Sequence, residues 1–137
     1  LDEYERSVSL TDFLGKKVIL YFYPKDMTPG CTLESCNLRE NHDLLTGEGF
    51  VVLGVSPDSS QSHQKFIGKY DLPFQLIADV KKELIEAYGV WGPKKFMGKE
   101  YEGVHRTTFV ISEDGYIERV FDKVKTKDHA KQILDSY

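Results

Sequence analysis

The chain is poor in cysteine and has no long apolar run, and both shortages exclude whole classes of protein. Its 137 residues include only two cysteines. Two cysteines form at most one disulfide, so a small secreted domain held together by several disulfides is not expected. Two cysteines also cannot supply a four-sulfur zinc site. His42 follows Cys36 by six residues, outside the usual zinc spacings, and no metal is predicted. No apolar run approaches the roughly 18 residues of a membrane-spanning helix.

The chain also lacks an excess of positive charge. Its net charge is −4, which argues against nucleic acid or an anionic membrane as a main partner. No secretory signal is visible at the start, so the expected location is cytoplasmic, although an upstream strand or a removed targeting segment stays open. With 40% apolar residues, the chain has enough material for one core, and we expect a single domain over 1–137.

Two continuous apolar runs, at residues 18–23 and 50–55, predict strands buried on both faces. A helix predicted over 31–46, ending at two nearby glycines, makes the right-handed crossover between them. The remaining predicted elements are a helix over 59–70, a strand over 75–78, a helix over 81–88, a surface loop over 93–103, strands over 107–111 and 116–121 joined by an Asp-Gly turn, and a helix over 126–137. This order predicts an α/β thioredoxin-like sandwich, in which helices flank a central mixed sheet.

Both cysteines lie in the segment that joins the first strand to the following helix. Cys31 stands at the start of the helix, where free N–H groups and the positive end of the helix dipole favour a thiolate. Cys36, five residues later, can trap whatever Cys31 forms. The alternative is a purely structural role, in which both cysteines are small buried apolar residues, as free cysteines often are. The flanking residues favour redox chemistry at Cys31 over that alternative.

Those flanking residues shape the approach to Cys31. Pro24 and Pro29 stiffen the entry to the helix by fixing φ. Thr28 places a hydroxyl three residues before the cysteine, where it can accept from the helix start or contact a substrate. Gly30 lets the backbone approach a ligand closely. The segment therefore has the parts of a small, rigid substrate pocket.

The spacing of the two cysteines carries a mechanical prediction. In an intact helix their Cα atoms would lie about 8.6 Å apart and roughly 140° apart around the axis. A disulfide requires a Cα separation below about 7 Å. We therefore expect a Cys31–Cys36 disulfide only if the start of the helix unwinds.

The same segment resembles the active site of the peroxiredoxins. Their pattern places Pro, Thr or Ser, and Cys at the spacing of Pro24, Thr28 and Cys31. The continuation from Gly30 to Cys36 is similar to the bacterioferritin comigratory protein, or PrxQ, subfamily, and the segments 21–26, 88–92 and 106–111 also fit. The resemblance covers nearly the whole chain. Members usually begin with another strand or hairpin, of which residues 1–10 would be only the end.

The resemblance implies a mechanism and a reductant. Arg106 would be the partner of the Cys31 thiolate, although a lone arginine at a strand start is otherwise a solvated charge. Cys31 would attack a hydroperoxide and become a sulfenic acid, which Cys36 would convert into an intramolecular disulfide for reduction by thioredoxin. No metal, haem or flavin is required, and a resolving cysteine within the chain is consistent with a monomer. Glu34 would brace the site, or be an exposed helix acid.

Other residues and functions are weaker candidates. Asp26 is interpreted as a turn residue, and His42, His63, His105 and His129 as surface or cap residues. One competing function is a thiol–disulfide oxidoreductase on the same fold, which would normally use Cys-x-x-Cys. Another is a non-catalytic binding module with a structural disulfide.

Overall fold

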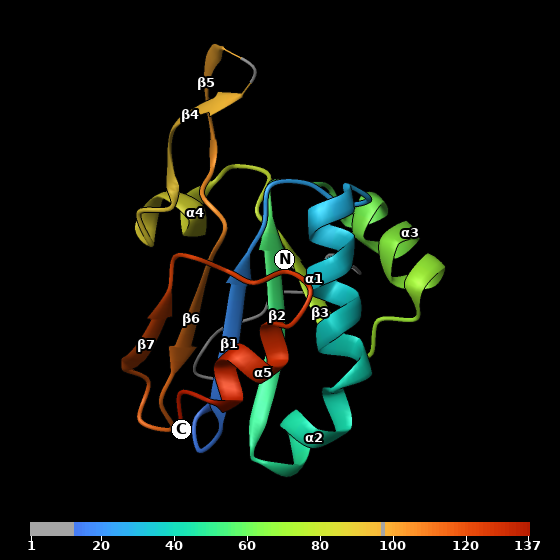
Figure 1. Ribbon diagram of the computed structural model, residues 1–137, viewed down its shortest axis with the longest axis vertical. Helices are drawn as coiled ribbons and strands as arrows, with labels where there is room; N and C mark the ends of the chain where they lie inside the picture. Colours follow the sequence, from blue (N-terminus) through green and yellow to red (C-terminus); the bar gives the residue numbers. More distant parts are fainter. Residues whose placement is uncertain (1–12, 97) are drawn as a thin grey trace.

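The computed structural model describes residues 13–96 and 98–137, and a five-stranded mixed sheet organises them. The central strand β1 (Lys17–Phe22) pairs in parallel with β2 (Phe50–Ser56) and antiparallel with β6 (Thr107–Ile111). Outside these lie β3 (Gln75–Ala78), parallel to β2, and β7 (Ile117–Phe121), antiparallel to β6. The predicted mixed sheet is therefore confirmed (Figure 1).

Most helices cover one face of this sheet. They are α1 (Pro29–Glu40), α2 (His42–Gly47), α3 (Ser60–Tyr70) and α5 (His129–Leu134). Alternate residues of β1 pack into this layer, and the intervening residues pack into a second core on the opposite face, where α4 (Glu83–Ala87) lies. Among the described residues, no helix is long and apolar enough to cross a bilayer.

The helix after β1 differs from the prediction at both ends. It begins at Pro29, two residues before Cys31, because proline suits the first helical position, where its missing N–H loses no bond. It ends at Glu40, and the expected single helix over 31–46 is wrong. Asn41 has φ −107° and ψ 11°, and its side-chain amide donates to the Asn37 carbonyl at 2.8 Å. This local bond competes with the helix ladder and separates α1 from α2.

The surface loop predicted over 93–103 is also wrong. A two-stranded antiparallel hairpin occupies this region, formed by β4 (Trp91–Phe96) and β5 (Lys99–Val104). It projects from the end of the molecule where α4 lies (Figure 1). Much of it meets solvent, as the exposed Tyr101 illustrates. No alternation between polar and apolar residues was therefore available to reveal the strands.

Candidate active site

Cys31 lies where β1 ends and α1 begins. It is the third residue of α1, and its side chain is fully buried. Thr28 is the N-cap residue, but its hydroxyl donates to the Lys25 carbonyl at 2.8 Å instead of accepting from the helix. Half-buried Pro24 lies in the loop that connects β1 to α1. Thr28 and Gly30 therefore lie at the start of α1, and Pro24 lies in the loop that leads to it.

Arg106 reaches this site through strand pairing. Since β6 runs antiparallel to β1, Thr107 is paired with Phe22, and the preceding Arg106 lies beside the carboxyl end of β1. Its Nη2 donates to Cys31 Sγ at 3.2 Å, and its Nη1 donates to Glu34 Oε1 at 2.7 Å. One guanidinium thus contacts the thiol and a carboxyl group at once.

Gly30 allows this approach. A Cβ atom at this position would lie 3.1 Å from Arg106 Nη2, closer than a side chain tolerates without a shift of the guanidinium. Gly30 therefore permits a close approach, as expected, but the group that approaches its backbone here is the Arg106 side chain.

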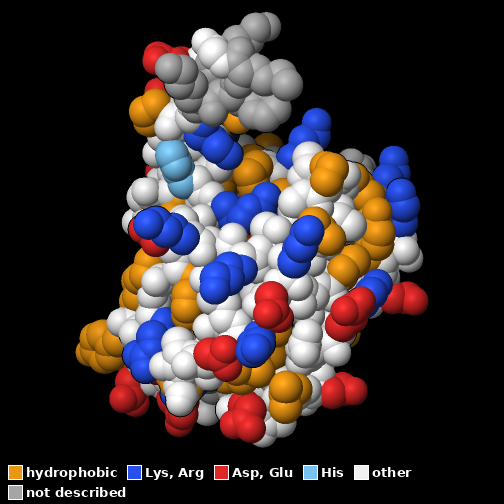
Figure 2. All heavy atoms as spheres, viewed as in Figure 1, with side chains coloured by type: hydrophobic (Ala, Val, Ile, Leu, Met, Phe, Trp, Pro, Cys, Tyr) orange, Lys and Arg blue, Asp and Glu red, His pale blue; other side chains and the backbone are white. Residues whose placement is uncertain are grey.

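The electrostatic environment favours an anion at Cys31. The start of α1 and the guanidinium of Arg106 both stabilise negative charge there. Burial alone would lower the pKa of Arg106, but the nearby Glu34 and Cys31 raise it above its usual value, so the cation persists. Figure 2 shows Lys and Arg side chains over the upper part of the visible face, towards the carboxyl end of β1, and most acidic side chains below.

Glu34 is buried and charge-coupled to the site, and the alternative of an exposed helix acid is wrong. Its side chain is fully buried. Burial raises its pKa from 4.5 to about 7, even though Arg106 opposes the change. Its second oxygen, Oε2, has no hydrogen-bond partner among the described residues and lies 3.5 Å from His129 Nε2. Glu34 therefore titrates near neutrality.

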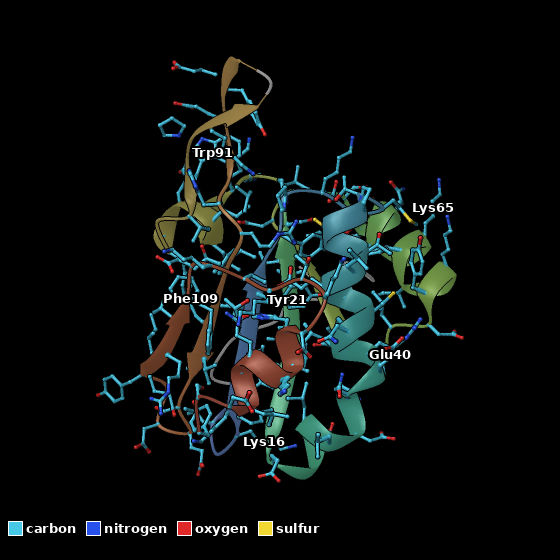
Figure 3. The ribbon with its side chains drawn as sticks, in the orientation of Figure 1. Lys16, Tyr21, Glu40, Lys65, Trp91 and Phe109 are labelled. Atoms are coloured by element: carbon cyan, nitrogen blue, oxygen red, sulfur yellow. The ribbon has the colours of Figure 1, made fainter. Side chains whose placement is uncertain are left out.

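Cys36 is half-buried and, like Cys31, a free thiol. Both lie on the unbroken helix α1, which is also fastened to β1. Tyr21, labelled between the sheet and α1 in Figure 3, shares a hydrogen bond of 2.9 Å with Ser35. The structure therefore brings Arg106 and Glu34 to Cys31 but keeps the two cysteines on an intact helix.

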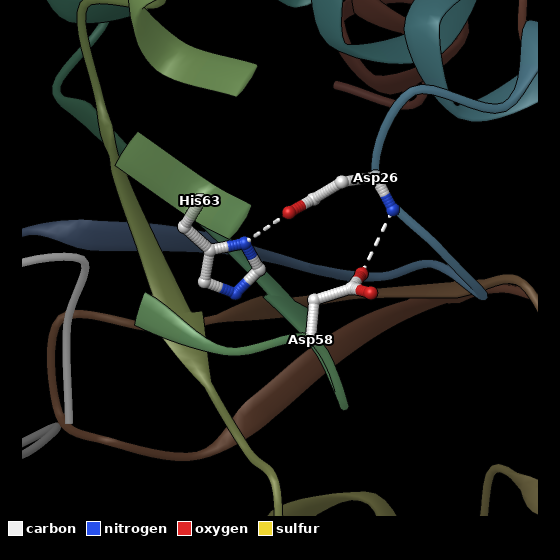
Figure 4. A group of neighbouring side chains, drawn as sticks. All are labelled: Asp26, Asp58 and His63. Atoms are coloured by element: carbon white, nitrogen blue, oxygen red, sulfur yellow. Dashed lines mark hydrogen bonds and ion pairs between the residues drawn. The ribbon is translucent and has the colours of Figure 1, made fainter. Parts of the chain in front are cut away.

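Asp26 and His63 form a buried cluster close to this site (Figure 4). Asp26 lies in a turn, as expected, but its side chain is buried, and the assignment of His63 to the surface is wrong. His63 Nδ1 lies 2.7 Å from Asp26 Oδ2. The hydroxyls of Tyr23 and Ser62 also donate to the Asp26 carboxylate, at 2.6 and 2.8 Å. The Asp26 backbone N–H donates to Asp58. This cluster links the loop before Cys31 to α3 and to the segment that follows β2.

His129 is likewise buried, contrary to its assignment to the surface. The sequence did contain a signal for both histidines. His63 precedes the inward-facing Phe66 by three residues, and His129 precedes the inward-facing Ile133 by four. Each histidine therefore shares a helix face with core residues, a periodicity that indicates burial.

Asp26, Asp58 and His63 also have the composition of a metal site, with one possible ligand atom from each lying within 4.8 Å of the others. Their nearest polar atoms are occupied by hydrogen bonds inside the cluster. We therefore describe the group as a structural network.

Comparison with known proteins agrees with this geometry. The AhpC/TSA family profile matches residues 1–120. Peroxiredoxin Bcp of Escherichia coli (strain K12) is 48% identical over 98% of this chain and 86% of its own length. Peroxiredoxin Bcp of Bacillus subtilis (strain 168) is 46% identical over 98% and 85%.

Among solved structures, the bacterioferritin comigratory protein of Xanthomonas campestris, studied for its alkyl peroxide reduction activity, superposes with a TM-score of 0.88. It is 35% identical and covers 94% of this chain and 82% of its own. The chain therefore belongs to the AhpC/TSA family and is a thiol-dependent peroxidase of the peroxiredoxin type. The resemblance to the bacterioferritin comigratory subfamily and the thioredoxin-like fold are confirmed.

Proposed function

We propose that Cys31 is the peroxide-reactive thiol of this enzyme and that Cys36 is the thiol that resolves its oxidised form. The contact of 3.2 Å between Arg106 Nη2 and Cys31 Sγ, at the start of α1, carries the first assignment. A fixed cation and a helix N-terminus together make the thiolate, which is the nucleophile, the favoured form.

The reaction begins when the Cys31 thiolate attacks the terminal oxygen of a hydroperoxide. The O–O bond breaks, sulfur becomes a sulfenic acid, and the leaving oxygen departs as water or an alcohol after gaining a proton. Arg106, the Cys31 backbone N–H and Thr28 are the groups that hold the two peroxide oxygens and stabilise the developing charge. Pro24 and Gly30 shape the pocket around them.

Cys36 then condenses with the sulfenic acid, which releases water and forms an intramolecular disulfide. An intact α1 keeps the Cα atoms of these cysteines about 8.6 Å apart, beyond the reach of a disulfide. The first turns of α1 must therefore unwind. This releases the Ser35 hydroxyl from Tyr21 and weakens the contacts of Glu34.

A dithiol protein of the thioredoxin type completes the cycle by disulfide exchange. Hydrogen peroxide and organic hydroperoxides are the proposed substrates. Because both reacting thiols come from one helix, the cycle needs no second subunit, which supports a monomer. Two free thiols in a catalytic pair favour a reducing compartment, and we place the enzyme in the cytoplasm.

One equivalent of hydrogen peroxide added to the reduced protein tests the proposal. Stopped-flow kinetics with intact-mass analysis should show rapid loss of both thiols and one intramolecular disulfide. Cys31→Ser should abolish this reaction. Cys36→Ser should stop at the sulfenic acid with one equivalent of peroxide, and a second equivalent should oxidise it to the sulfinic acid. Oxidation no faster than that of free cysteine, with efficient disulfide exchange, would favour the oxidoreductase alternative.

A further inference from the structure

The buried groups around Arg106 are unbalanced in charge. Arg106 is the cation in hydrogen-bond contact with both Cys31 and Glu34. If the thiol and the carboxyl were both ionised, two negative charges would share the one guanidinium that contacts them, in a buried site. An uncompensated buried charge is costly, so one proton should stay on the pair.

The contacts of His129 show which group holds that proton. Its Nδ1 lies 2.9 Å from Gln132 Oε1. That oxygen already accepts from the Lys125 backbone N–H, and the Gln132 amide nitrogen donates to the Lys123 carbonyl. Nδ1 must therefore be the donor, and Nε2 of a neutral ring carries a lone pair.

This lone pair accepts the hydroxyl hydrogen of Thr108, whose Oγ1 lies 2.8 Å away, whereas Glu34 Oε2 lies 3.5 Å from the same nitrogen. Burial lowers the pKa of His129 to about 4, so the ring is neutral at physiological pH and forms no ion pair with Glu34. His129 therefore offers no proton to Oε2, which has no hydrogen-bond partner among the described residues, so an ionised carboxylate is not stabilised on this side and the neutral acid is favoured.

We propose that Glu34 is a neutral carboxylic acid in the reduced enzyme and loses its proton as Cys31 is oxidised, so that it replaces the thiolate as the anionic partner of Arg106. His129 is a positioning residue whose neutral ring, with Nε2 bonded to Thr108, leaves Oε2 without a donor that would stabilise the carboxylate. The proposal rests on the peroxidase function assigned above. The pKa of about 7 for Glu34 is consistent with a proton that moves under physiological conditions.

The step balances in atoms and charge. The thiolate gives an electron pair to the terminal peroxide oxygen, which keeps its own proton in the sulfenic acid. The O–O bonding pair leaves with the second oxygen as alkoxide or hydroxide, which takes the proton lost by Glu34. One anion faces Arg106 before the reaction, the thiolate, and one faces it afterwards, the carboxylate. The buried site therefore never gains a net charge.

Two further ionisable groups, Tyr21 and Lys94, lie near Cys31 and Glu34. From β1, Tyr21 has a pKa well above its usual value because of burial, so it stays neutral. From β4, Lys94 donates to the Val104 carbonyl at 2.9 Å and interacts electrostatically with Arg106 and Cys31. Tyr21 therefore keeps its proton, and burial is the main cause that lowers the pKa of Lys94. Glu34 is the carboxyl group of this site whose pKa lies near neutrality.

Infrared difference spectroscopy on Cys36→Ser, which keeps the sulfenic acid from being resolved, tests the proposal. At about pH 6, below the Glu34 pKa, the reduced protein should show the C=O stretch of a protonated carboxyl, and one equivalent of hydrogen peroxide should abolish it. Glu34→Gln should lack the band, Glu34→Asp should keep a shifted one, and the exposed Glu40→Gln should leave it unchanged.

A reduced protein without the band, or a band that survives formation of the sulfenic acid, would overturn the proposal. Intact mass separates this failure from failure of the proposed function. If peroxide adds no oxygen atom to Cys36→Ser, the peroxidase assignment itself is wrong, whatever the infrared spectrum of the reduced state shows.

Discussion

Two buried pairs of a carboxyl group and a histidine flank α1, and their geometry differs. On the side of α3, Asp26 lies 2.7 Å from His63 (Figure 4). On the side of α5, Glu34 lies 3.5 Å from His129. The residue types are nearly the same, so the difference between the pairs arises from the groups around them.

In the Asp26 pair, both oxygens of the carboxyl group have hydrogen-bond partners. His63 Nε2 lies 3.0 Å from the Ile77 carbonyl, which can only accept, so this nitrogen carries a proton. Nδ1 faces a carboxylate that two hydroxyls also stabilise. A hydrogen-bond network in which every group has a partner has one stable arrangement, and here it holds the loop before Cys31 in place.

The Glu34 pair is incomplete by contrast. Its Oε2 has no hydrogen-bond partner among the described residues, and its cation is shared with a thiol whose charge changes during the reaction. Reactive sites often retain such unsatisfied buried groups, because a proton can then move at low cost. The comparison indicates that a buried carboxyl group with all its hydrogen bonds made has a structural role. A buried carboxyl group that lacks some of them can change its protonation state during the reaction.

The largest expected effect is the loss of stability when the Asp26–His63 pair is broken. His63→Leu leaves the buried Asp26 carboxyl without the histidine that lies 2.7 Å from it, and should lower the free energy of unfolding by about 3–5 kcal/mol. His129→Leu removes a neutral ring and should cost only about 1–3 kcal/mol. Urea denaturation of both variants measures the two values. Equal losses would contradict the difference between the two pairs.

Removing the shared cation should have the next largest effect. Arg106→Met eliminates the donor to Cys31 Sγ, and the rate of thiol oxidation by peroxide should fall by about 10² to 10³-fold. Arg39→Met provides the control, because Arg39 also lies on the helical layer but donates to the Tyr70 carbonyl at 2.7 Å, away from the site. Stopped-flow fluorescence of Trp91, the single tryptophan, can follow both reactions.

Titration of Glu34 should appear in the pH dependence of stability. Its folded pKa of about 7 exceeds 4.5, so the folded state binds more protons between these values. Its stabilising contribution is complete below about pH 4.5 and is lost as the pH rises through 7, by at most about 3 kcal/mol. Glu34→Gln lacks this loss, so its stability relative to the parent should rise with pH across this window.

His129 contributes with the opposite sign. Its folded pKa of about 4 lies below 6.5, so its contribution is present above about pH 6.5 and lost as the pH falls through 4. The histidine contributes to both proteins in the comparison and largely cancels in their difference. A difference between Glu34→Gln and the parent that does not change with pH would show that Glu34 is ionised throughout.

The smallest expected effect concerns the position of Arg106. Gly30→Ala would place a Cβ atom 3.1 Å from Nη2 and displace the guanidinium by a few tenths of an ångström. The peroxide rate should fall by about tenfold, while alanine's better helix propensity preserves or raises stability. Gly68→Ala in α3, which has open space around it, is the matched control and should leave the rate unchanged.

Local sequence was sufficient for the strands of the sheet and for the reactive segment. The apolar run that forms β1 and the proline, threonine and cysteine that follow it all act through neighbours in the chain, so their pattern was informative. The β4–β5 hairpin was missed because a solvent-exposed ribbon needs no apolar face. The break at Asn41 was missed because a side-chain amide there competes with the helix ladder.

The sequence alone determined that a thiol stands at the first turn of a helix after a buried strand, since strand, turn and helix start are set by adjacent residues. Only the tertiary structure decided what surrounds that thiol. Arg106, 75 residues from Cys31, arrives through the antiparallel pairing of β1 and β6. His129 reaches Glu34 because α5 packs beside α1. Contacts between distant segments, which no local pattern records, set the charges and protons at Cys31.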